Sequence, residues 1–354
     1  MNTEKDIKNI IKPIIFWVGF PACGLLVKKV ADEFKDELII VATRPEVPFQ
    51  GLEEYLGHKI IWFNNPNDIW EHREEFRDRN LVIHTGWRYE GWLKYDKFVK
   101  KKNNAKVIVS VDNRFRGDLR QMFGAIYFRL YLKRFFDAVL VPGKSGIKLM
   151  KFLGMDESKI YTGLYGAYEG IFQEVTPIEN RNKEFLFIGQ LIKRKSVDIL
   201  IRAFKEYRKN GGSWNLRLVG NGPLGDICHG DGIILEDFAQ PNEIAKKMNH
   251  AKALVLLSKD DNWGTVVCEA AACGMNILTT KTVGASEDIV REGINGTILN
   301  DITVSNIQKA LFYFENLTEK ILKDGSSVSK EIAKKYDSEA YFNSFMKMIV
   351  DSTK

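Results

Sequence analysis

Cysteine is scarce in this chain, with four in 354 residues, at positions 23, 228, 268 and 273. None of them forms a C-x-x-C pair or stands in a histidine-containing ligand pattern. The common zinc sites and a disulfide framework are therefore not indicated. The usage of cysteine favours a reducing compartment.

Long hydrophobic runs are also missing. No stretch approaches the roughly 20 apolar residues that a membrane-spanning helix requires. The N-terminal MNTEKDIKNIIKPIIFWVGF has acidic residues early and a short apolar run interrupted by Pro13, unlike a signal peptide. We expect a cytoplasmic protein.

Charge of one sign is not in large excess, because 52 Lys and Arg face 46 Asp and Glu, for a net charge of +6. Proteins that bind nucleic acid usually carry a denser basic stripe. The modest excess favours anionic small molecules or anionic lipid surfaces instead. We expect no nucleic-acid partner.

Short apolar runs that end in Gly, Asn, Asp, Ser, Thr or Pro occur throughout the chain, with helical periodicity between several of them. This pattern is typical of parallel sheets covered by helices on both faces. The runs are 14–20, 38–43, 59–64, 81–86, 106–112 and 138–143, and then 184–189, 215–220, 232–238, 253–258 and 276–280.

The polar stretch QEVTPIENRNK, which follows Phe172, separates the two series of runs as a linker would. We predict two doubly wound α/β domains, 1–175 and 180–337, that form a cleft at the carboxyl ends of their strands, where such sheets bind ligands. The last segment is predicted to be a helix with a cap at Asp337 or Ser338. We expect this helix, 338–354, to pack back on the first domain.

A basic loop follows the first strand of the second series, in FIGQLIKRKSVDILIRAF (187–204). Gly189 ends the strand, Arg194 and Lys195 lie in the loop, and Ser196 is the predicted N-cap of a helix. Free backbone N–H groups, the helix dipole and a cation together make an anion site, usually for phosphate. The alternative is a solvated basic turn. The next strand ends in VGNGPLG (219–225), which permits close backbone approach or is simply a tight turn.

Two acidic residues flank a helix start in DNWGTVVCEAAACGM (261–275). Gly264 or Thr265 begins the helix and Gly274 ends it. Glu269 lies one turn beyond Thr265, so its carboxylate and that of Asp261 could point toward the hydroxyls of one ligand. The alternative is that Asp261 stabilises the helix dipole and Glu269 is buried and paired. The amides of the following TVGASEDIV (282–290) could also face the cleft.

In combination these motifs resemble the nucleotide-sugar domain of retaining glycosyltransferases of family 4, also called glycosyl transferases group 1. The resemblance runs from residue 138 to residue 345. VLVPGKSGIKLMKFLGMDESKIYTGLYGAYEGIF (139–172) is similar to the end of the first domain of that family, and LRLVGNGP (216–223) to its glycine turn. The resemblance implies a GT-B fold, with two Rossmann-like α/β domains facing a cleft, and transfer of a sugar from a nucleotide-diphosphate donor.

The resemblance also implies roles for individual residues. Lys195 matches the lysine that binds the donor diphosphate, Glu269 the acid that holds the ribose, and Asp261 the acid near the transferred sugar. The other donor-binding positions that it implies are Gly19, Gly24, Gly189, Gln190, Arg194, Gly220, Phe238, Gly264 and Thr265.

Three positions depart from the pattern of the family. Asp261 stands in place of a glutamate, and Gln190 in place of a phosphate-binding arginine, whose bidentate guanidinium an amide cannot replace. Arg194 could substitute for it if the loop points its side chain inward. Asp112 aligns with the active-site histidine of the family, so we include it among the candidate catalytic residues.

The family is thought to transfer the sugar by a same-face substitution in which the leaving diphosphate accepts the proton of the acceptor hydroxyl. No acid in the expected cleft has a clear claim to act as a nucleophile. The sequence has no Asp-x-Asp pair, so we expect neither a metal nor another cofactor.

Residues of the first domain bear on the acceptor. Residues 116–140 combine aromatic residues with Arg and Lys, and could contact the inner face of an anionic membrane and present a lipid-linked or lipopolysaccharide acceptor. The alternative is a helix with its apolar face on the sheet and a solvated basic face. His84, Trp87 and Asp112 are candidate acceptor contacts, and ordinary packing is the alternative for the first two.

Two other functions stay open at this point. A sugar-nucleotide epimerase with the GT-B fold would have the same two domains, but we find no acid and base residues for it. A non-catalytic scaffold that binds a nucleotide-sugar would agree with Gln190 and Asp112.

Overall fold

The computed structural model describes residues 10–18, 24–44, 49–172 and 175–353. The chain divides into two compact units, Met1–Tyr165 with Ser338–Lys354, and Gly166–Asp337. The first unit ends at Tyr165, earlier than the predicted boundary at residue 175. The reason is that Phe172 is buried in the second unit, where the Cys273 thiol donates to its carbonyl oxygen at 3.8 Å.

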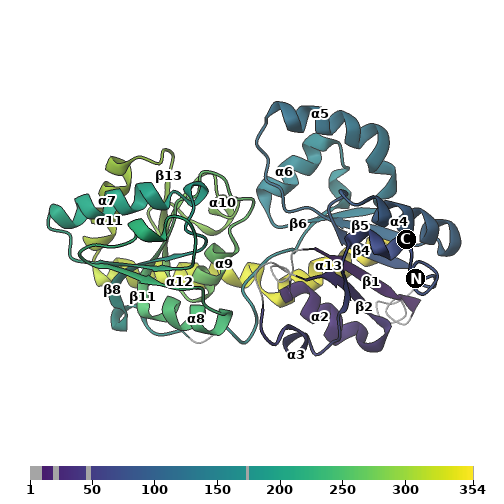
Figure 1. The fold of residues 1–354 in the computed structure, drawn as a ribbon, viewed down its shortest axis with the longest axis horizontal. Helices are drawn as coiled ribbons and strands as arrows, with labels where there is room; N and C mark the ends of the chain where they lie inside the picture. The colour runs from purple at the N-terminus through teal and green to yellow at the C-terminus, as the bar shows by residue number, and fades with distance from the viewer. Residues whose placement is uncertain (1–9, 19–23, 45–48, 173–174, 354) are drawn as a thin grey trace. The chain divides into compact units, whose positions relative to one another are not determined.

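The first unit contains a seven-stranded sheet in the order β3-β2-β1-β4-β5-β6-β7, and each neighbouring pair is parallel (Figure 1). This is the order of a doubly wound sheet. Its strands are β1 (Pro13–Trp17), β2 (Ile39–Thr43), β3 (Ile61–Phe63), β4 (Leu81–Thr85), β5 (Lys106–Ser110), β6 (Ala138–Val141) and β7 (Ile160–Thr162).

Helices cover both faces of this sheet, so β1 is buried on both sides and reads as a continuous apolar run. Ile15 and Trp17 join one hydrophobic core, and Ile14 and Phe16 join the other. The helices are α2 (Gly24–Phe34), α3 (Leu52–Leu56), α4 (Glu90–Asn103), α5 (Leu119–Tyr127), α6 (Lys144–Leu153) and α13 (Ser338–Thr353).

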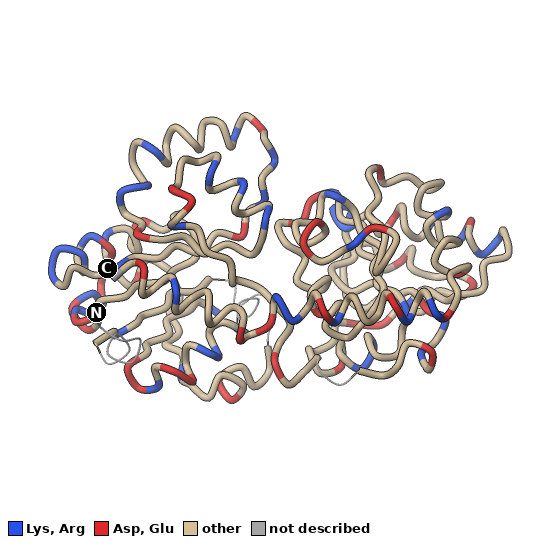
Figure 2. Tube along the Cα trace, turned by 180° about the vertical axis from the view of Figure 1, so that it is seen from behind, with Lys and Arg blue, Asp and Glu red and all other residues tan. Residues whose placement is uncertain are grey.

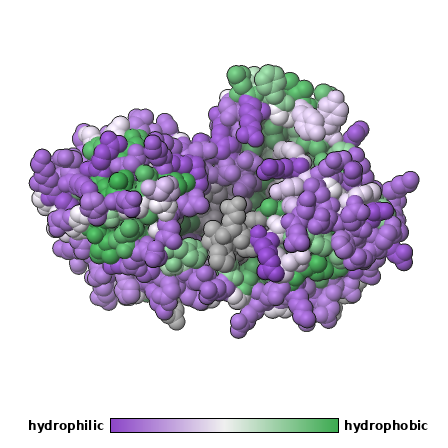
Figure 3. Space-filling view, in the orientation of Figure 1, coloured by the Kyte–Doolittle hydropathy of each residue, from purple (hydrophilic) through white to green (hydrophobic). Residues whose placement is uncertain are grey.

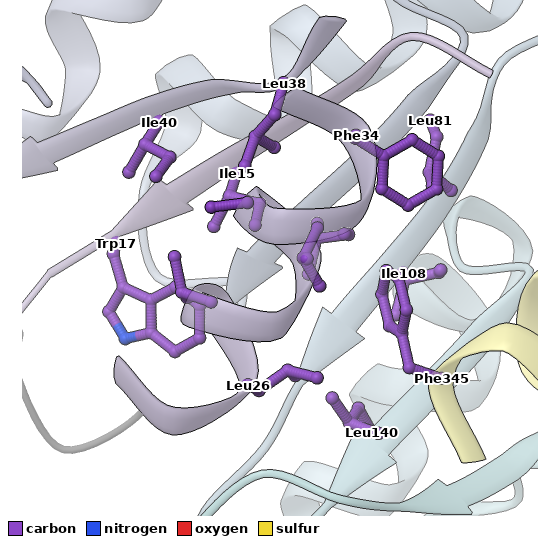
Figure 4. Close-up of a cluster of buried hydrophobic side chains, with 14 of the residues drawn as sticks. Ile15, Trp17, Leu26, Phe34, Leu38, Ile40, Leu81, Ile108, Leu140 and Phe345 are labelled. Carbon is purple, nitrogen blue, oxygen red and sulfur yellow. The ribbon is translucent and has the colours of Figure 1, made fainter. Parts of the chain in front are cut away.

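The C-terminal helix α13 packs in the first unit against α2 and β7. Its Phe345 is fully buried, and Figure 4 shows the ring beside Ile108 of β5. The helix begins at Ser338, so Asp337, one of the two caps expected from the sequence, stands at the N-cap position.

The second unit contains a six-stranded parallel sheet in the order β10-β9-β8-β11-β12-β13. Its strands are β8 (Asn182–Ile188), β9 (Asn215–Val219), β10 (Ile233–Glu236), β11 (Ala251–Leu256), β12 (Asn276–Thr280) and β13 (Gly296–Leu299). Its helices are α7 (Val197–Lys209), α8 (Pro241–His250), α9 (Thr265–Ala272), α10 (Ser286–Ile289), α11 (Val304–Glu315) and α12 (Glu319–Ala333).

A strand forms at every position predicted from the apolar runs, and the α/β class is confirmed. Two strands, β7 and β13, were not predicted. Both are short edge strands, and each has only two adjacent apolar residues, too few to form an apolar run. The predicted linker is only partly irregular, because Ile178–Asn180 form a 3₁₀ turn and Asn182 already begins β8.

No helix in the described part of the chain is long and apolar enough to cross a membrane.

Candidate functional site

The candidate donor site lies in the second unit, where parallel strands present their carboxyl ends at one edge of the sheet. At this edge, the backbone of the turn after β8 is in direct contact with the backbone of the turn after β9. The Gly189 amide donates to the Val219 carbonyl oxygen at 3.0 Å. Both Gly189 and Gly220 have positive φ, and a Cβ atom on Gly220 would lie 2.1 Å from the carbonyl oxygen of Gly189. Glycine is therefore required at Gly220 for the two turns to meet.

Replacing Gly220 with alanine is expected to destabilise the second unit by about 3 kcal/mol, because the new methyl group collides with backbone and the φ of 141° is unfavourable for alanine. Urea unfolding measures the change. Gly225→Ala is the matched control in the same turn, where the nearest atom to the new Cβ is Leu191 Cδ1 at 3.8 Å. Equal destabilisation by both variants would contradict the requirement for close approach.

An ion pair joins two loops at this edge. Lys195 closes the 3₁₀ turn after β8, and its Nζ donates to Oδ2 of Asp261 at 2.5 Å. The two side chains are only 13% and 14% exposed, so water screens the pair little. Ser258 Oγ, just after β11, donates to the same Asp261 oxygen at 3.4 Å.

The loop between β11 and α9, which carries Asp261 and is called the acidic loop below, is held in place by the segment after β12. The Asp261 amide donates to the Thr282 carbonyl oxygen, and the Gly284 amide donates to the Asp261 carbonyl oxygen, both at 3.1 Å. The Ala285 amide donates to the Trp263 carbonyl oxygen at 2.8 Å. The expectation that these Gly-Ala amides face a ligand is therefore wrong, because they satisfy the loop that carries Asp261.

The basic loop also contains Arg194, Gln190 and Ser196, which differ in their contacts. Arg194 is exposed, and its Nη1 donates to the Asp260 carbonyl oxygen at 2.8 Å, so its guanidinium lies against the acidic loop. Gln190 is exposed, and its side chain makes no hydrogen bond to the described residues. Ser196 stands at the N-cap position but has a φ of 55° and makes no capping bond with its side chain. The prediction of a serine side-chain cap is thus wrong, since its left-handed backbone turns the hydroxyl into the core.

Helix α9 begins and ends where the sequence predicted. Gly264 precedes it with a φ of 84°, and a Cβ there would lie 2.7 Å from Val283 Cγ1. Thr265 is its first residue, and Gly274 follows the C-cap with a φ of 67°. The helix therefore presents Glu269 one turn after its start.

Glu269 is partly buried, and its carboxyl group makes no hydrogen bond or ion pair with the described residues. Burial raises the pKa of this carboxyl to about 7, because an ionised group loses solvation there. A half-buried acid without a partner is typical of a binding or catalytic site. The paired structural glutamate considered as the alternative is not what the structure contains.

Phe238 follows β10 and is 45% exposed. The strand end before it is fixed, because Arg217 and Lys247 both donate to the Glu236 carboxylate, which lowers the pKa of that carboxyl. An exposed ring on a rigid strand end is suited to stacking on a planar group.

The candidate acceptor residues lie in the first unit, and the role predicted for one of them is wrong. His84 on β4 is 1% exposed, and its Nε2 lies 3.1 Å from Oδ2 of Asp96 on α4. It has no free surface for an acceptor, because β4 is a central strand covered by α4. Trp87 is half buried and packs on Phe128, with ring centroids 5.2 Å apart. Packing therefore accounts for His84, whose role as an acceptor contact is wrong, whereas Trp87 is still partly exposed and stays a candidate.

Asp112 follows β5 and accepts a hydrogen bond from the Tyr165 hydroxyl at 3.3 Å. Gly24 is the first residue of α2, and Gly19 lies outside the described residues. In the described ranges, no group of three or more His, Cys, Asp or Glu side chains is placed to hold a metal ion.

Comparison with known proteins bears on the second unit most directly. Residues 170–326 match the family described as glycosyl transferases group 1. The match covers most of the second unit, which is therefore similar to the domains of that family. The chain is 27% identical over 179 residues to the uncharacterized glycosyltransferase MJ1178 of Methanocaldococcus jannaschii, and the alignment covers 48% of each protein. The chain thus spans about half the length of this curated relative.

Solved structures are similar over both units. The crystal structure of Anabaena Alr3699/HepE in complex with UDP and glucose has a TM-score of 0.76 at 14% identity, with 96% of this chain and 100% of that chain covered. The glycosyltransferase from Rickettsia africae ESF-5 has a TM-score of 0.77 at 14% identity, with 98% and 99% covered. These similarities confirm the GT-B fold predicted from the sequence.

The sequence did not single out Ser258 or Thr282, which shape the acidic loop of the second unit. Ser258 is fully buried and donates to Asp261, and the Thr282 hydroxyl donates to the Ser258 carbonyl oxygen at 2.5 Å. Ser258 could have been noticed as a polar residue directly after a buried strand. The sequence alone does not show that its hydroxyl contacts Asp261.

Proposed function

We propose that this chain is a retaining glycosyltransferase that moves a sugar from a nucleotide-diphosphate donor to a glycan or a lipid-linked acceptor. The observation that carries the proposal is the Lys195–Asp261 pair in the second unit, which lies in the loops before α9, the helix that carries the unpartnered Glu269. A cation suits the diphosphate, and the two carboxylates suit sugar and ribose hydroxyls.

In the proposed site, binding of the donor would separate Lys195 from Asp261. A donor diphosphate would replace Asp261 as the partner of Lys195, which frees the carboxylate of Asp261 to accept hydrogen bonds from the transferred sugar. Glu269 would accept from the ribose hydroxyls, and the exposed ring of Phe238 would stack on the base. Arg194, next to the acidic loop, would supply the charge that Gln190 lacks.

In the proposed reaction the bond between the anomeric carbon and the diphosphate oxygen breaks. The acceptor hydroxyl attacks from the same face, and the leaving diphosphate takes its proton. The protein contributes position and positive charge, with Lys195 stabilising the charge that develops on the phosphate. The proposal assigns no step to a metal. Asp112, held by the Tyr165 hydroxyl, is assigned to orient the acceptor.

The Anabaena protein was crystallised with UDP and glucose, which supports a UDP-sugar as the first donor to try. We propose synthesis of a cell-surface polysaccharide or lipopolysaccharide as the process that this activity serves.

The test is release of nucleoside diphosphate from a panel of UDP-, GDP- and ADP-sugars, with and without a glycan or lipid extract as acceptor. Wild type is compared with Glu269→Ala, and Glu206→Ala on an exposed face of α7 is the control. We expect release from one donor, stimulated by the acceptor and reduced at least about tenfold in Glu269→Ala.

Two results would contradict the proposal. Binding of a nucleotide-sugar without release, in the presence of every acceptor, would identify a binding protein instead of an enzyme. Conversion of one nucleotide-sugar into another would identify an epimerase.

A further inference from the structure

Helix α5 and the π turn that continues it, Phe128–Leu132, carry a face of exposed hydrophobic side chains. Each is more than half exposed, from 52% for Met122 to 71% for Phe123. Figure 3 shows hydrophobic surface gathered over α5. This α5 face consists of Leu119, Met122, Phe123, Ile126, Tyr127, Leu130 and Tyr131.

The α5 face is not the side of the helix that packs in the core. Its members recur at three- and four-residue intervals, which places them on one side of a helix. The core side is formed by Ala125, Phe128 and Leu132, which are buried among the residues of the first unit. Folding of the unit therefore does not account for the α5 face.

The α5 face is also concentrated. It contributes seven of the fifteen large hydrophobic side chains that are exposed in the described residues, and the others are scattered over both units. Single exposed hydrophobic residues are ordinary on proteins, whereas a contiguous apolar patch marks a surface that meets a partner.

The charges around the α5 face are mostly positive, and two of the cations are paired with acids, Lys133 with Asp156 and Lys151 with Glu157. Residues 114–136 contain six Lys or Arg and one acid, Asp118, whose carboxylate caps α5 by accepting from the Gln121 amide at 2.8 Å. The adjacent α6 has lysines at 144, 148 and 151 and no acid. Figure 2 shows this predominance of Lys and Arg along the segment.

We propose that the α5 face docks on an anionic phospholipid bilayer. A helix with large apolar side chains on one side and cations at its flanks lies in the interface of such a membrane, with the apolar groups among the acyl chains and the cations at the phosphates. Tyr127 and Tyr131 have the amphipathic rings that prefer this depth.

A second copy of the chain fits the α5 face less well than a bilayer does. In a symmetric pair the same patch meets itself, so the cations of one copy would face the cations of the other. An anionic membrane is complementary in both hydrophobicity and charge. The inference goes beyond the proposed transfer reaction and does not depend on it, because membrane binding is measured without substrate.

Vesicle flotation with the full chain tests this inference. We expect the chain to float with vesicles of phosphatidylcholine and phosphatidylglycerol, to bind much less to phosphatidylcholine alone, and to bind more weakly as salt rises. The double variant Phe123→Ser/Leu130→Ser is expected to lower the partition coefficient at least about tenfold. Both positions are exposed, so the fold is expected to survive, and circular dichroism checks this.

The matched control is Tyr313→Ser/Ile321→Ser, which removes two exposed hydrophobic side chains of α11 and α12 in the second unit. It is expected to bind vesicles as wild type does. Absence of binding to anionic vesicles, or equal binding by both double variants, would overturn the inference. A dimer in light scattering that only Phe123→Ser/Leu130→Ser dissociates, with no vesicle binding, would assign the face to self-association instead. Failure of the nucleotide-release test leaves the flotation result unaffected.

Discussion

Replacing Lys195 with methionine is expected to lower kcat/KM for the nucleotide-sugar about 100- to 1000-fold. The ammonium group is the buried cation of the proposed site, and removing one donor that stabilises developing charge has effects of this size. Steady-state kinetics with the donor found in the release panel measures the change. Lys193→Met is the matched control, because Lys193 lies in the same 3₁₀ turn but is exposed. We expect it to retain nearly full activity.

Loss of activity in Lys195→Met could also result from unfolding, since Asp261 would keep a largely buried charge without its cation. The double variant Lys195→Met/Asp261→Asn removes both charges and is expected to recover much of the lost stability without recovering activity. If the double variant regained activity, Lys195 would serve only to neutralise Asp261, and its assignment to the diphosphate would be wrong.

Replacing Glu269 with glutamine is expected to stabilise the second unit in a pH-dependent way. The pKa of this carboxyl is raised by burial to about 7, from an ordinary value of 4.5. Well below pH 4.5 the carboxyl is neutral in the folded and the unfolded chain, so glutamine brings no gain. As the pH rises toward 7, the Glu269 carboxyl ionises in the unfolded chain before it does so in the folded chain. The free energy of unfolding of wild type therefore falls by up to about 3 kcal/mol relative to that of the glutamine variant.

Urea unfolding at pH 4.5 and at pH 8 measures this difference. The free energies of unfolding of wild type and Glu269→Gln are expected to differ by less than about 0.5 kcal/mol at pH 4.5 and to separate at pH 8, with the variant more stable. Glu206→Gln, on the exposed face of α7, is the control and is expected to show no such separation. The same Glu269→Gln variant is expected to lose donor turnover. Burial of the Glu269 carboxyl group destabilises the fold, and a role in the proposed reaction explains why an acid is present there. A variant less stable than wild type at pH 8 would contradict the burial of an unpartnered acid.

The sequence by itself determined the α/β class, the positions of most strands and the limits of α9. Each of these follows from local chemistry. A buried parallel strand needs an apolar run such as LVIHTG, and a helix stop such as Gly274 needs a positive φ that glycine adopts without strain. The short edge strand β7 was not predicted, because its two adjacent apolar residues do not form such a run.

Only the tertiary structure decided which side chains meet. Lys195 and Asp261 are 66 positions apart, and no local pattern pairs them. His84 looked available after an apolar run, yet its partner Asp96 lies on the helix that covers its strand. The pKa of Glu269 depends on the burial of its carboxyl group, which is set by neighbours distant in the chain.

The same limit applies to α5. Its sequence has apolar residues on two sides of the helix, and periodicity alone cannot tell which side enters the core. The fold buries Phe128 and Leu132 and leaves Phe123 and Leu130 in water. Local chemistry fixes which residues form an element, while burial, pairing and exposure depend on the elements packed around it, and these determine the function of a surface.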